Sequence, residues 1–232
     1  MNIQRPPQQI TLFDLDQTLL PIDSDREWGN FLVKLGVVDR HIYESENERF
    51  YKEYVGGVLD INEFLAFALK PLAAHPMKTL LSWRSQFIKE VIQPCLRPEA
   101  LDLVSMHISK GDLCCVVTAT NSFVTRPIVD LFHIPHLVAT EPELKEDPSG
   151  LVFTGKVKGL PNFQQGKVFN VKNWLSGLGY DLSTFSQSTF YTDSMNDLPL
   201  LEIVSNPIAT NPDLRLKNLA IERSWQMINL FQ

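Results

Sequence analysis

The sequence has little of what metal-thiolate and disulfide-stabilised proteins require. Only three of its 232 residues are cysteines, and no CxxC spacing occurs among them. Cys114 and Cys115 lie in the apolar run 113–117, which is typical of a buried strand, so we interpret them as small core residues. The five histidines form no ligand-spaced pair, which argues against a zinc site.

Long apolar runs and excess positive charge are missing as well. No segment reaches the roughly 20 apolar residues of a membrane span, and the sequence shows no stretch of the signal-peptide kind. The net charge is −6 and the pI is near 5.4, so general affinity for nucleic acid or anionic membranes is not expected. We expect a cytoplasmic protein whose partner is a small molecule; the sequence does not indicate an oligomeric state.

What is present is an alternation of apolar segments of strand length with longer helical patterns. This alternation predicts an α/β fold with a mostly parallel sheet flanked by helices. The strands are expected at 10–15, 113–118, 136–140, 188–192 and 207–210. Two further segments, 143–146 and 152–155, flank the turn sequence 147–150 and predict a β-hairpin.

One part of the chain breaks this alternation. Between residues 24 and 93 there is no convincing strand, and the apolar residues recur at helical spacing. The expected helices lie near 24–35, 41–55, 61–72 and 76–92. We therefore predict a four-helix insertion at 21–94, which divides the α/β unit into 1–20 and 95–232.

Two carboxylates follow the first expected strand. Asp14 and Asp16 are two residues apart, so both can point the same way beyond the C-terminal end of the strand. Open α/β sheets bind ligands at that edge. Adjacent carboxylates repel each other, so the arrangement costs stability unless a cation or a proton compensates. Taken alone, the pair fits a polar turn equally well.

A second acidic cluster follows the strand expected at 188–192. It has the sequence Thr192-Asp193-Ser194-Met195-Asn196-Asp197. If the two strands are parallel neighbours, three or four carboxylates converge at one edge of the sheet, and together with water and phosphate they would suit Mg2+. Asp193 or Asp197 could also cap a helix N-terminus, a role that does not exclude the first.

Two more segments could bind an anion. Residues 116–121 run from a strand into a turn and a helix, so the Thr118 hydroxyl and the backbone N–H groups after it could cradle an anion, although a threonine here could also be a simple cap. Lys167 follows Gly166 near a helix N-terminus, against the preference of the helix dipole. It is either a solvated lysine or the partner of a negative charge elsewhere.

Taken in order, these four elements resemble the motifs of the haloacid dehalogenase-like (HAD) superfamily. The motifs are Asp-x-Asp-x-Thr, a strand-end Ser or Thr, a lysine and a late acidic pair, and the resemblance covers the full chain. The helical insertion after the first motif and the form Asp-Ser-x-x-Asp-x-Pro are similar to subfamily IB, the phosphoserine-phosphatase-like enzymes. The resemblance implies a Rossmann-like HAD core with an inserted four-helix cap.

The resemblance also implies a function, that of a Mg2+-dependent phosphatase acting on a small phosphomonoester. Asp14 would attack phosphorus and form an aspartyl-phosphate, and Asp16 would protonate the leaving alcohol and then activate water. Asp14, the backbone carbonyl of Asp16 and the Asp193 side chain would bind Mg2+.

The remaining implied roles concern the phosphate and the substrate. Thr118 and Lys167 would hold phosphoryl oxygens, and Asp197 would orient Lys167 or a metal-bound water. Substrate or phosphate contacts are further expected from Thr18, Asp23, Arg26, Ala119, Thr120 and Asn196.

The chain departs from phosphoserine phosphatases in three places. Ala119 and Thr120 stand where those enzymes usually have glycines, and Thr192-Asp193-Ser194 replaces their Gly-Asp-Gly. Their substrate-recognising glutamate is replaced, near the matching position, by Asp23. A phosphorylated amino acid or amino alcohol is the leading substrate expectation from the resemblance. Two alternatives stay open: a phosphotransferase that uses the same intermediate, and a catalytically idle sensor of a phosphate ligand.

Overall fold

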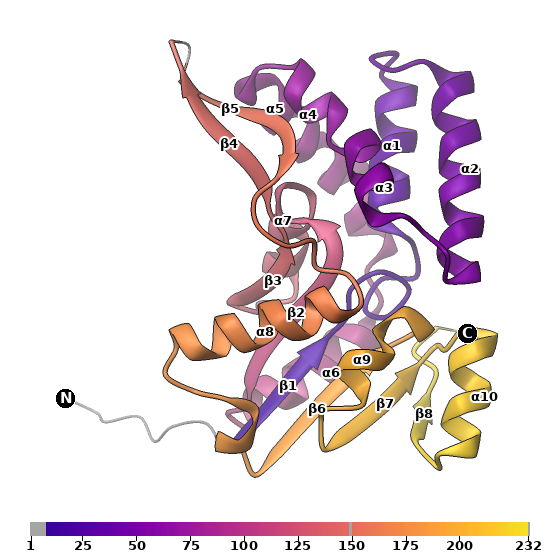
Figure 1. Cartoon of the computed structure of the whole chain (residues 1–232), viewed down its shortest axis with the longest axis vertical. Coiled ribbons are helices and arrows are strands. Elements are labelled where there is room, and N and C mark those ends of the chain that lie inside the picture. Colours follow the sequence, from indigo (N-terminus) through magenta and orange to yellow (C-terminus); the bar gives the residue numbers. More distant parts are fainter. Residues whose placement is uncertain (1–7, 149, 232) are drawn as a thin grey trace.

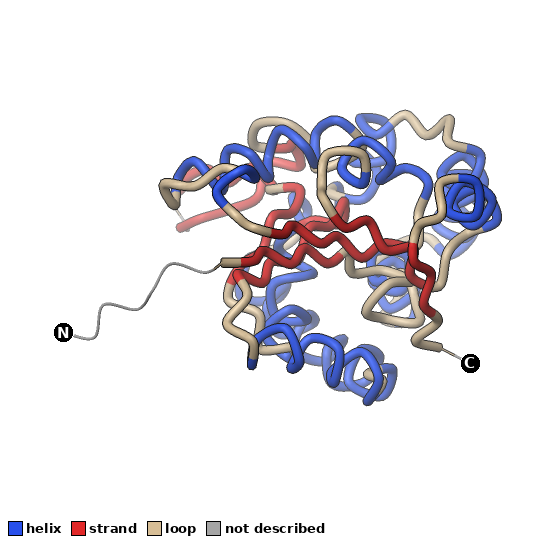
Figure 2. The backbone as a smooth tube through the Cα atoms, turned by 90° about the horizontal axis from the view of Figure 1, so that it is seen from below, coloured by secondary structure: helices blue, strands red, loops and turns tan. Residues whose placement is uncertain are grey.

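A six-stranded parallel sheet forms the centre of the protein (Figures 1 and 2). The computed structural model describes residues 8–148 and 150–231. The strand order is β3-β2-β1-β6-β7-β8, so β1 pairs with both β2 and β6. The strands are β1 (Gln9–Phe13), β2 (Leu113–Asn121), β3 (His136–Thr140), β6 (Gln187–Thr192), β7 (Asn206–Thr210) and β8 (Gln226–Ile228). The predicted α/β fold class is confirmed.

Helices cover both faces of this sheet (Figure 2). The helices outside the insertion are α6 (Pro98–Ser109), α7 (Ser122–Leu131), α8 (Gln165–Gly177), α9 (Leu198–Leu201) and α10 (Leu214–Glu222). Because side chains alternate along a strand, β1 serves two hydrophobic clusters. Phe13 packs with residues of α6 and α7, whereas Ile10 and Leu12 pack with residues of α8, α9 and α10.

The insertion after β1 is helical, as predicted, and it lies beyond the C-terminal ends of the strands (Figure 1). Its helices are α1 (Ser24–Lys34), α2 (Arg40–Gly56), α3 (Ile61–Ala68), α4 (Lys70–Ala74) and α5 (Met77–Phe87). The helix expected at 61–72 is divided into α3 and α4. Pro71 explains the division, because a proline is tolerated in the first turn of a helix but breaks the hydrogen-bond ladder of a helix interior.

The expected hairpin is present as β4 (Pro142–Asp147) and β5 (Gly150–Val157), which pair antiparallel. Ser149 of the turn lies outside the described residues. The hairpin reaches the helical insertion: β5 packs against α4, where Ala73 lies next to Gly155. Phe153 of β5 also meets Phe123 of α7 edge to face, with ring centroids 5.3 Å apart. The hairpin therefore connects the insertion with the sheet.

The strand β8 is not predicted from the sequence. It has three residues, of which Gln226 and Met227 are exposed, so it has no apolar run that would reveal it. Asn211 fixes the segment that follows, because its side-chain oxygen accepts a hydrogen bond from Leu230 N at 2.6 Å. Among the helices of the described residues, none is long and apolar enough to cross a membrane.

We predict that Gly166→Ala destabilises the fold. A Cβ at Gly166 would collide with the backbone carbonyl oxygen of Pro161, so α8 could not begin where it does. Overpacking of this kind costs about 1–3 kcal/mol, which urea unfolding will measure.

The matched control is Gly177→Ala in the same helix. A Cβ at Gly177 meets nothing within 4 Å, so this change should leave the free energy of unfolding unchanged or raise it by up to about 1 kcal/mol. Equal stability of the two variants would contradict the packing argument.

Candidate active site

The expected chemical groups meet at the C-terminal edge of the sheet. Asp14 directly follows β1 and stays in the strand ladder, because its N–H donates to Tyr191 O at 2.8 Å. Thr118 lies near the end of β2, Asp193 follows β6, and Lys167 lies in the first turn of α8. One pocket, with a cavity of about 170 Å³, is lined by side chains from all four segments.

Lys167 lies between two carboxylates. Its Nζ donates to Asp14 Oδ1 and to the Asp197 carboxylate, each at 2.8 Å. All three residues are buried, and Lys167 is only 2% exposed. Thr192 completes the group by donating its hydroxyl to Asp197 Oδ2 at 2.7 Å. The lysine is therefore not a solvated surface residue, and the alternative of a negative partner is correct.

Burial and charge oppose each other in this group. Burial lowers the pKa of Lys167, but the charges of Asp14 and Asp197 outweigh it and hold that pKa above its ordinary value. For Asp14 the balance is different, since burial raises its pKa to about 6 although Lys167 acts to lower it. The lysine thus keeps the Asp14 carboxylate largely ionised near neutral pH.

A second pair of carboxylates meets at the hydroxyl group of Thr18. Thr18 Oγ1 lies 3.3 Å from Asp14 Oδ2 and 3.2 Å from Asp193 Oδ1, and it accepts a hydrogen bond from Asp193 N at 3.0 Å. Because a hydroxyl has one proton, it cannot satisfy both carboxylate oxygens at once. Burial and the charge of Asp14 raise the pKa of Asp193 well above its usual range.

This excess of buried carboxylate oxygen fits a divalent cation. Within the described residues, no three His, Cys, Asp or Glu side chains are arranged to hold a metal ion. Two carboxylates, those of Asp14 and Asp193, with a backbone carbonyl and water would be an ordinary Mg2+ environment, because this ion usually keeps several waters. The donor set therefore fits the expected metal.

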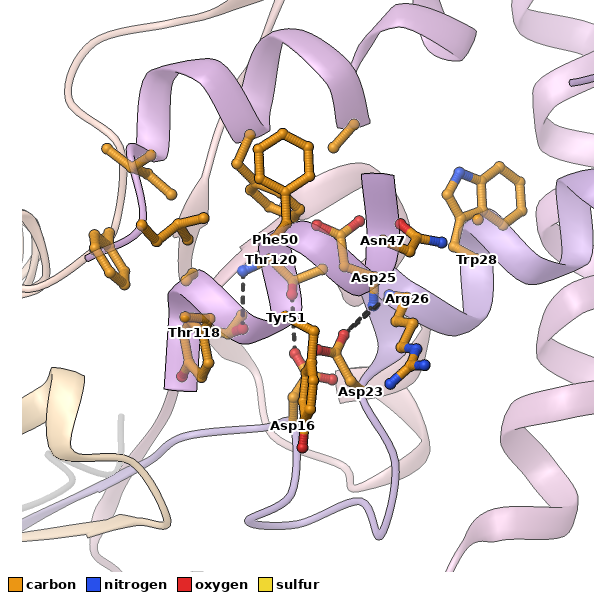
Figure 3. A pocket seen from close by; sticks show the side chains of 18 of the residues that line it. Asp16, Asp23, Asp25, Arg26, Trp28, Asn47, Phe50, Tyr51, Thr118 and Thr120 are labelled. Atoms are coloured by element: carbon orange, nitrogen blue, oxygen red, sulfur yellow. Dashed lines mark hydrogen bonds between the residues drawn. The ribbon is translucent and has the colours of Figure 1, made fainter. Parts of the chain in front are cut away.

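Asp16 has a different environment from Asp14. Its Oδ1 accepts from Ser24 N at 2.7 Å. Its Oδ2 accepts from the Thr120 hydroxyl at 2.9 Å, as Figure 3 shows. Burial, and next the charge of Asp23, raise the pKa of Asp16 to about 7. A carboxyl group with this pKa exchanges a proton near neutral pH, as a general acid and base must.

The C-terminal part of β2 forms another wall of the pocket. Thr118 Oγ1 accepts from Thr120 N at 3.1 Å (Figure 3), and the pairing of β2 with β3 shifts its register between Val117 and Asn121. Thr118, Ala119 and Thr120 all line the pocket. The backbone here leaves the regular ladder, which frees it to turn around an anion.

The expected residues of the insertion lie at the same pocket. Asp23 and Arg26 both line it. Asp23 also caps α1, because its Oδ1 accepts from Asp25 N and Arg26 N, each at 3.0 Å. The Arg26 guanidinium lies 5.1 Å from the ring centre of Tyr51 and 3.7 Å from a Glu48 oxygen.

Two expected residues are not in the lining of the pocket. Thr18 is fully buried beneath it and contacts Asp14 and Asp193 as described. Asn196 donates from Nδ2 to Tyr54 O at 3.0 Å, so it joins the loop after β6 to α2. Their expected role in phosphate or substrate binding stays a prediction.

Several residues that support the site are not predicted from the sequence. Asn162 is fully buried, and its Nδ2 donates to Thr118 O at 2.8 Å and to Val138 O at 3.0 Å, so it ties the ends of β2 and β3 together. Tyr54 donates its hydroxyl to Ser194 Oγ at 3.0 Å. Asn211 donates to Gln17 O at 2.9 Å. These contacts join segments distant in the sequence, and no local motif signals them.

Comparisons with known proteins agree with this geometry. The family model of haloacid dehalogenase-like hydrolases matches residues 11–202. A histidinol-phosphatase of Neisseria meningitidis is 39% identical over 222 residues, which cover 96% of this chain and 99% of that protein. The solved structure of a Bordetella pertussis protein with unknown function is 44% identical, covers 97% of this chain and 100% of its own, and has a TM-score of 0.90.

A phosphoserine phosphatase solved as a phospho-aspartyl intermediate analogue shares the fold, with a TM-score of 0.67. It is 17% identical, over 98% of this chain and 95% of its own. The chain therefore belongs to the haloacid dehalogenase-like hydrolase family. Within that family it is a phosphoric monoester hydrolase, and its resemblance to the phosphoserine-phosphatase-like group is confirmed.

We predict that Asp193→Asn stabilises the metal-free protein. The carboxyl group of Asp193 is buried, and its pKa is raised well above the usual range. The protein therefore loses stability as pH rises above the ordinary pKa of an aspartate, and an amide, which does not titrate, removes this loss. In EDTA at neutral pH, the midpoint of thermal unfolding should rise by about 2–4 °C, the change that about 1 kcal/mol produces in a chain of this size.

Adding Mg2+ completes the test. The midpoint of the unchanged protein should increase with Mg2+ concentration, whereas that of Asp193→Asn should increase much less. If the variant has a lower midpoint than the parent in EDTA, or if its midpoint increases equally with Mg2+, then Asp193 does not bind the cation.

Proposed function

We propose that the protein is a Mg2+-dependent phosphatase that hydrolyses a small phosphomonoester through an aspartyl-phosphate at Asp14. The observation that carries the proposal is the difference between its two neighbouring aspartates. Asp14 is kept ionised by Lys167, as a nucleophile must be, and Asp16 has a pKa of about 7, as an acid and base must have.

The reaction would take two steps. In the first, an Asp14 oxygen forms a bond to phosphorus, the bond from phosphorus to the alcohol oxygen breaks, and Asp16 gives its proton to that oxygen. In the second, a water oxygen attacks phosphorus, Asp16 takes a proton from this water, and the Asp14 carboxylate leaves with release of phosphate. Asp16 would thus act first as the general acid and then as the general base.

The other groups would stabilise the phosphoryl oxygens. Lys167 and the Thr118 hydroxyl would bind them, and Asp197 would keep Lys167 in place. Mg2+ bound by Asp14, Asp193 and the Asp16 carbonyl would supply further positive charge. The phosphoserine phosphatase with the related fold was solved as a phospho-aspartyl intermediate analogue, which supports this assignment.

We further propose that the helical insertion, residues 21–94, acts as a cap over the catalytic part, residues 1–20 and 95–232. It supplies much of the pocket wall, and Tyr54 joins it to the loop after β6 through Ser194 and Asn196. A cap of this kind excludes water and selects the leaving alcohol.

The relatives suggest which esters to test first. The Neisseria meningitidis relative is named histidinol-phosphatase, so histidinol phosphate is the first candidate substrate. Phosphoserine is the second, from the solved phosphoserine phosphatase. Both are esters of amino alcohols or amino acids. Phosphate release with and without added alcohols will separate hydrolysis from transfer to an acceptor.

Asp14→Asn should abolish phosphate release while the protein stays folded. The amide cannot attack phosphorus, and Lys167 keeps Asp197 as its partner. Phosphate release from histidinol phosphate, phosphoserine and O-phosphoethanolamine, with Mg2+ and with EDTA, will measure the effect. The control is Asp102→Asn, an exposed aspartate of α6, which should behave like the parent. Full turnover in a verified Asp14→Asn protein would refute the mechanism.

Asp16→Asn should slow esters of alkyl alcohols more than p-nitrophenyl phosphate. An alkoxide needs a proton as it leaves, whereas p-nitrophenolate does not. We expect kcat to fall by about 10²–10⁴-fold for an alkyl ester, the usual contribution of a general acid. The loss with p-nitrophenyl phosphate should be smaller because only the base role remains. Equal losses of kcat for both esters would show that Asp16 does not protonate the leaving group.

A further inference from the structure

The pocket continues from the catalytic aspartates into the helical insertion, where its wall is aromatic. Four buried or half-buried rings contribute to this wall: Tyr43, Phe50, Phe64 and Phe67. They contact one another, with ring centres 4.6 Å apart for Tyr43 and Phe67 and 5.3 Å apart for Phe50 and Phe64. This end of the pocket suits a flat apolar group rather than a phosphate.

Three polar atoms in the same region have no hydrogen-bond partner within the described residues. They are Asp25 Oδ2, Trp28 Nε1 and Asn47 Nδ2, and each is buried. Their residues line the pocket, and Figure 3 draws them together at the side away from Thr118. Trp28 is only 2% exposed. A buried polar atom without a partner destabilises the empty pocket, so a ligand that supplies partners would be bound favourably.

Among the residues that the structure describes, no positively charged group acts on the Asp25 carboxyl. The neighbouring arginine, Arg26, lies over the Tyr51 ring and near Glu48. Burial, and next the charges of Asp23 and Asp16, raise the pKa of Asp25 well above its usual range, so the folded protein favours the neutral carboxyl group. Its Oδ2 is therefore a buried oxygen that a ligand can pair, for example by donating an N–H group.

The glycine at position 29 is part of this arrangement. A Cβ there would lie 3.1 Å from Asn47 Nδ2 and 3.5 Å from the Tyr43 ring. The contact with the Asn47 amide is tight, so the amide would have to shift by a few tenths of an ångström, whereas the contact with the ring is an ordinary one. Gly29 therefore allows α1 and α2 to pack closely without displacing the Asn47 amide.

The chemistry of the three free atoms narrows the class of ligand. Asp25 offers an acceptor, whereas Trp28 and Asn47 offer N–H donors. An ammonium group has only donors and would leave the two N–H groups unpaired. A carboxylate has only acceptors, and it would add negative charge beside the buried carboxyl groups of Asp16, Asp23 and Asp25. A planar ring with one N–H and one acceptor nitrogen satisfies both kinds of group and fits the aromatic wall.

We propose that this end of the pocket is a specificity subsite for an imidazole-like ring on the leaving alcohol. Asp25 accepts the ring N–H, and the N–H of Asn47 or Trp28 donates to the other ring nitrogen. The inference rests on the proposed phosphatase function, because the alcohol is placed by the phosphate that the catalytic aspartates bind. Asp25, Asn47 and Trp28 thus act in selectivity and not in phosphoryl transfer.

The test compares two esters that share an amine and differ in the ring. L-Histidinol phosphate carries an imidazole, and O-phosphoethanolamine does not. The unchanged protein should favour L-histidinol phosphate in kcat/KM. In Asp25→Asn this preference should fall by about 10–100-fold, the cost of leaving a buried polar group without its proper hydrogen-bond partner. Trp28→Phe, which keeps a ring, should lower it by about 3–10-fold.

The matched control is again Asp102→Asn, which makes the same substitution on the surface and should keep the preference of the parent. If the parent hydrolyses O-phosphoethanolamine at least as well as L-histidinol phosphate, the subsite proposal is wrong while the phosphatase proposal stands. The same conclusion follows if Asp25→Asn slows both esters equally with its fold intact.

A binding experiment separates the subsite from the chemistry. L-Histidinol, the alcohol without phosphate, should bind to the unchanged protein in calorimetry, and Asp25→Asn should weaken this binding by about 10-fold or more. This result does not depend on turnover, so it decides the subsite even if no ester is hydrolysed. Equal affinity of both proteins for L-histidinol would overturn the proposal.

Discussion

The ammonium group of Lys167, held between Asp14 and Asp197, is the interaction on which the site depends. Breaking a buried ion pair by removing one partner costs about 3–5 kcal/mol, so the three residues are coupled in the folded protein. The coupling also sets the chemistry, because it keeps the Asp14 carboxylate ionised in a buried place. Around this group, Asp16 and Asp193 add carboxyl groups that the lysine alone does not balance.

The fold supplies what this charge cluster needs. Gly166 allows α8 to start against the Pro161 carbonyl, which brings Lys167 to the edge of the sheet. Asn162 ties the ends of β2 and β3, and the parallel pairing of β1 with β6 sets Asp14 beside the loop of Asp193. The core thus holds the charged groups of the candidate active site. The helical insertion forms a part of the pocket that is aromatic and contains buried polar atoms without hydrogen-bond partners among the described residues.

Much of this arrangement could be predicted from the sequence, and the reasons are local. Asp14 and Asp16 directly follow a buried apolar strand, and the turn sequence 147–150 lies between the two strands of the hairpin. The helix break at Pro71 was not predicted, because the apolar residues keep helical spacing from 61 to 72. The contacts of Asn162 and Tyr54 could not be predicted, because they join segments far apart along the chain. The strand β8 was missed since it is short and half exposed. The placement of Asn196 against α2 depends on how the insertion closes, which no pattern in the sequence specifies.

The most direct test of the central claim is to find where the phosphoryl group goes. The enzyme would be mixed with L-histidinol phosphate and Mg2+, quenched in acid within one turnover and reduced with borohydride, which converts an aspartyl-phosphate to homoserine. Peptide mass spectrometry should find homoserine at Asp14 and nowhere else. The account would be contradicted if the ester is turned over and no homoserine is found after borohydride treatment. It would also be contradicted if homoserine is found at the position of Asp16, Asp193 or Asp197.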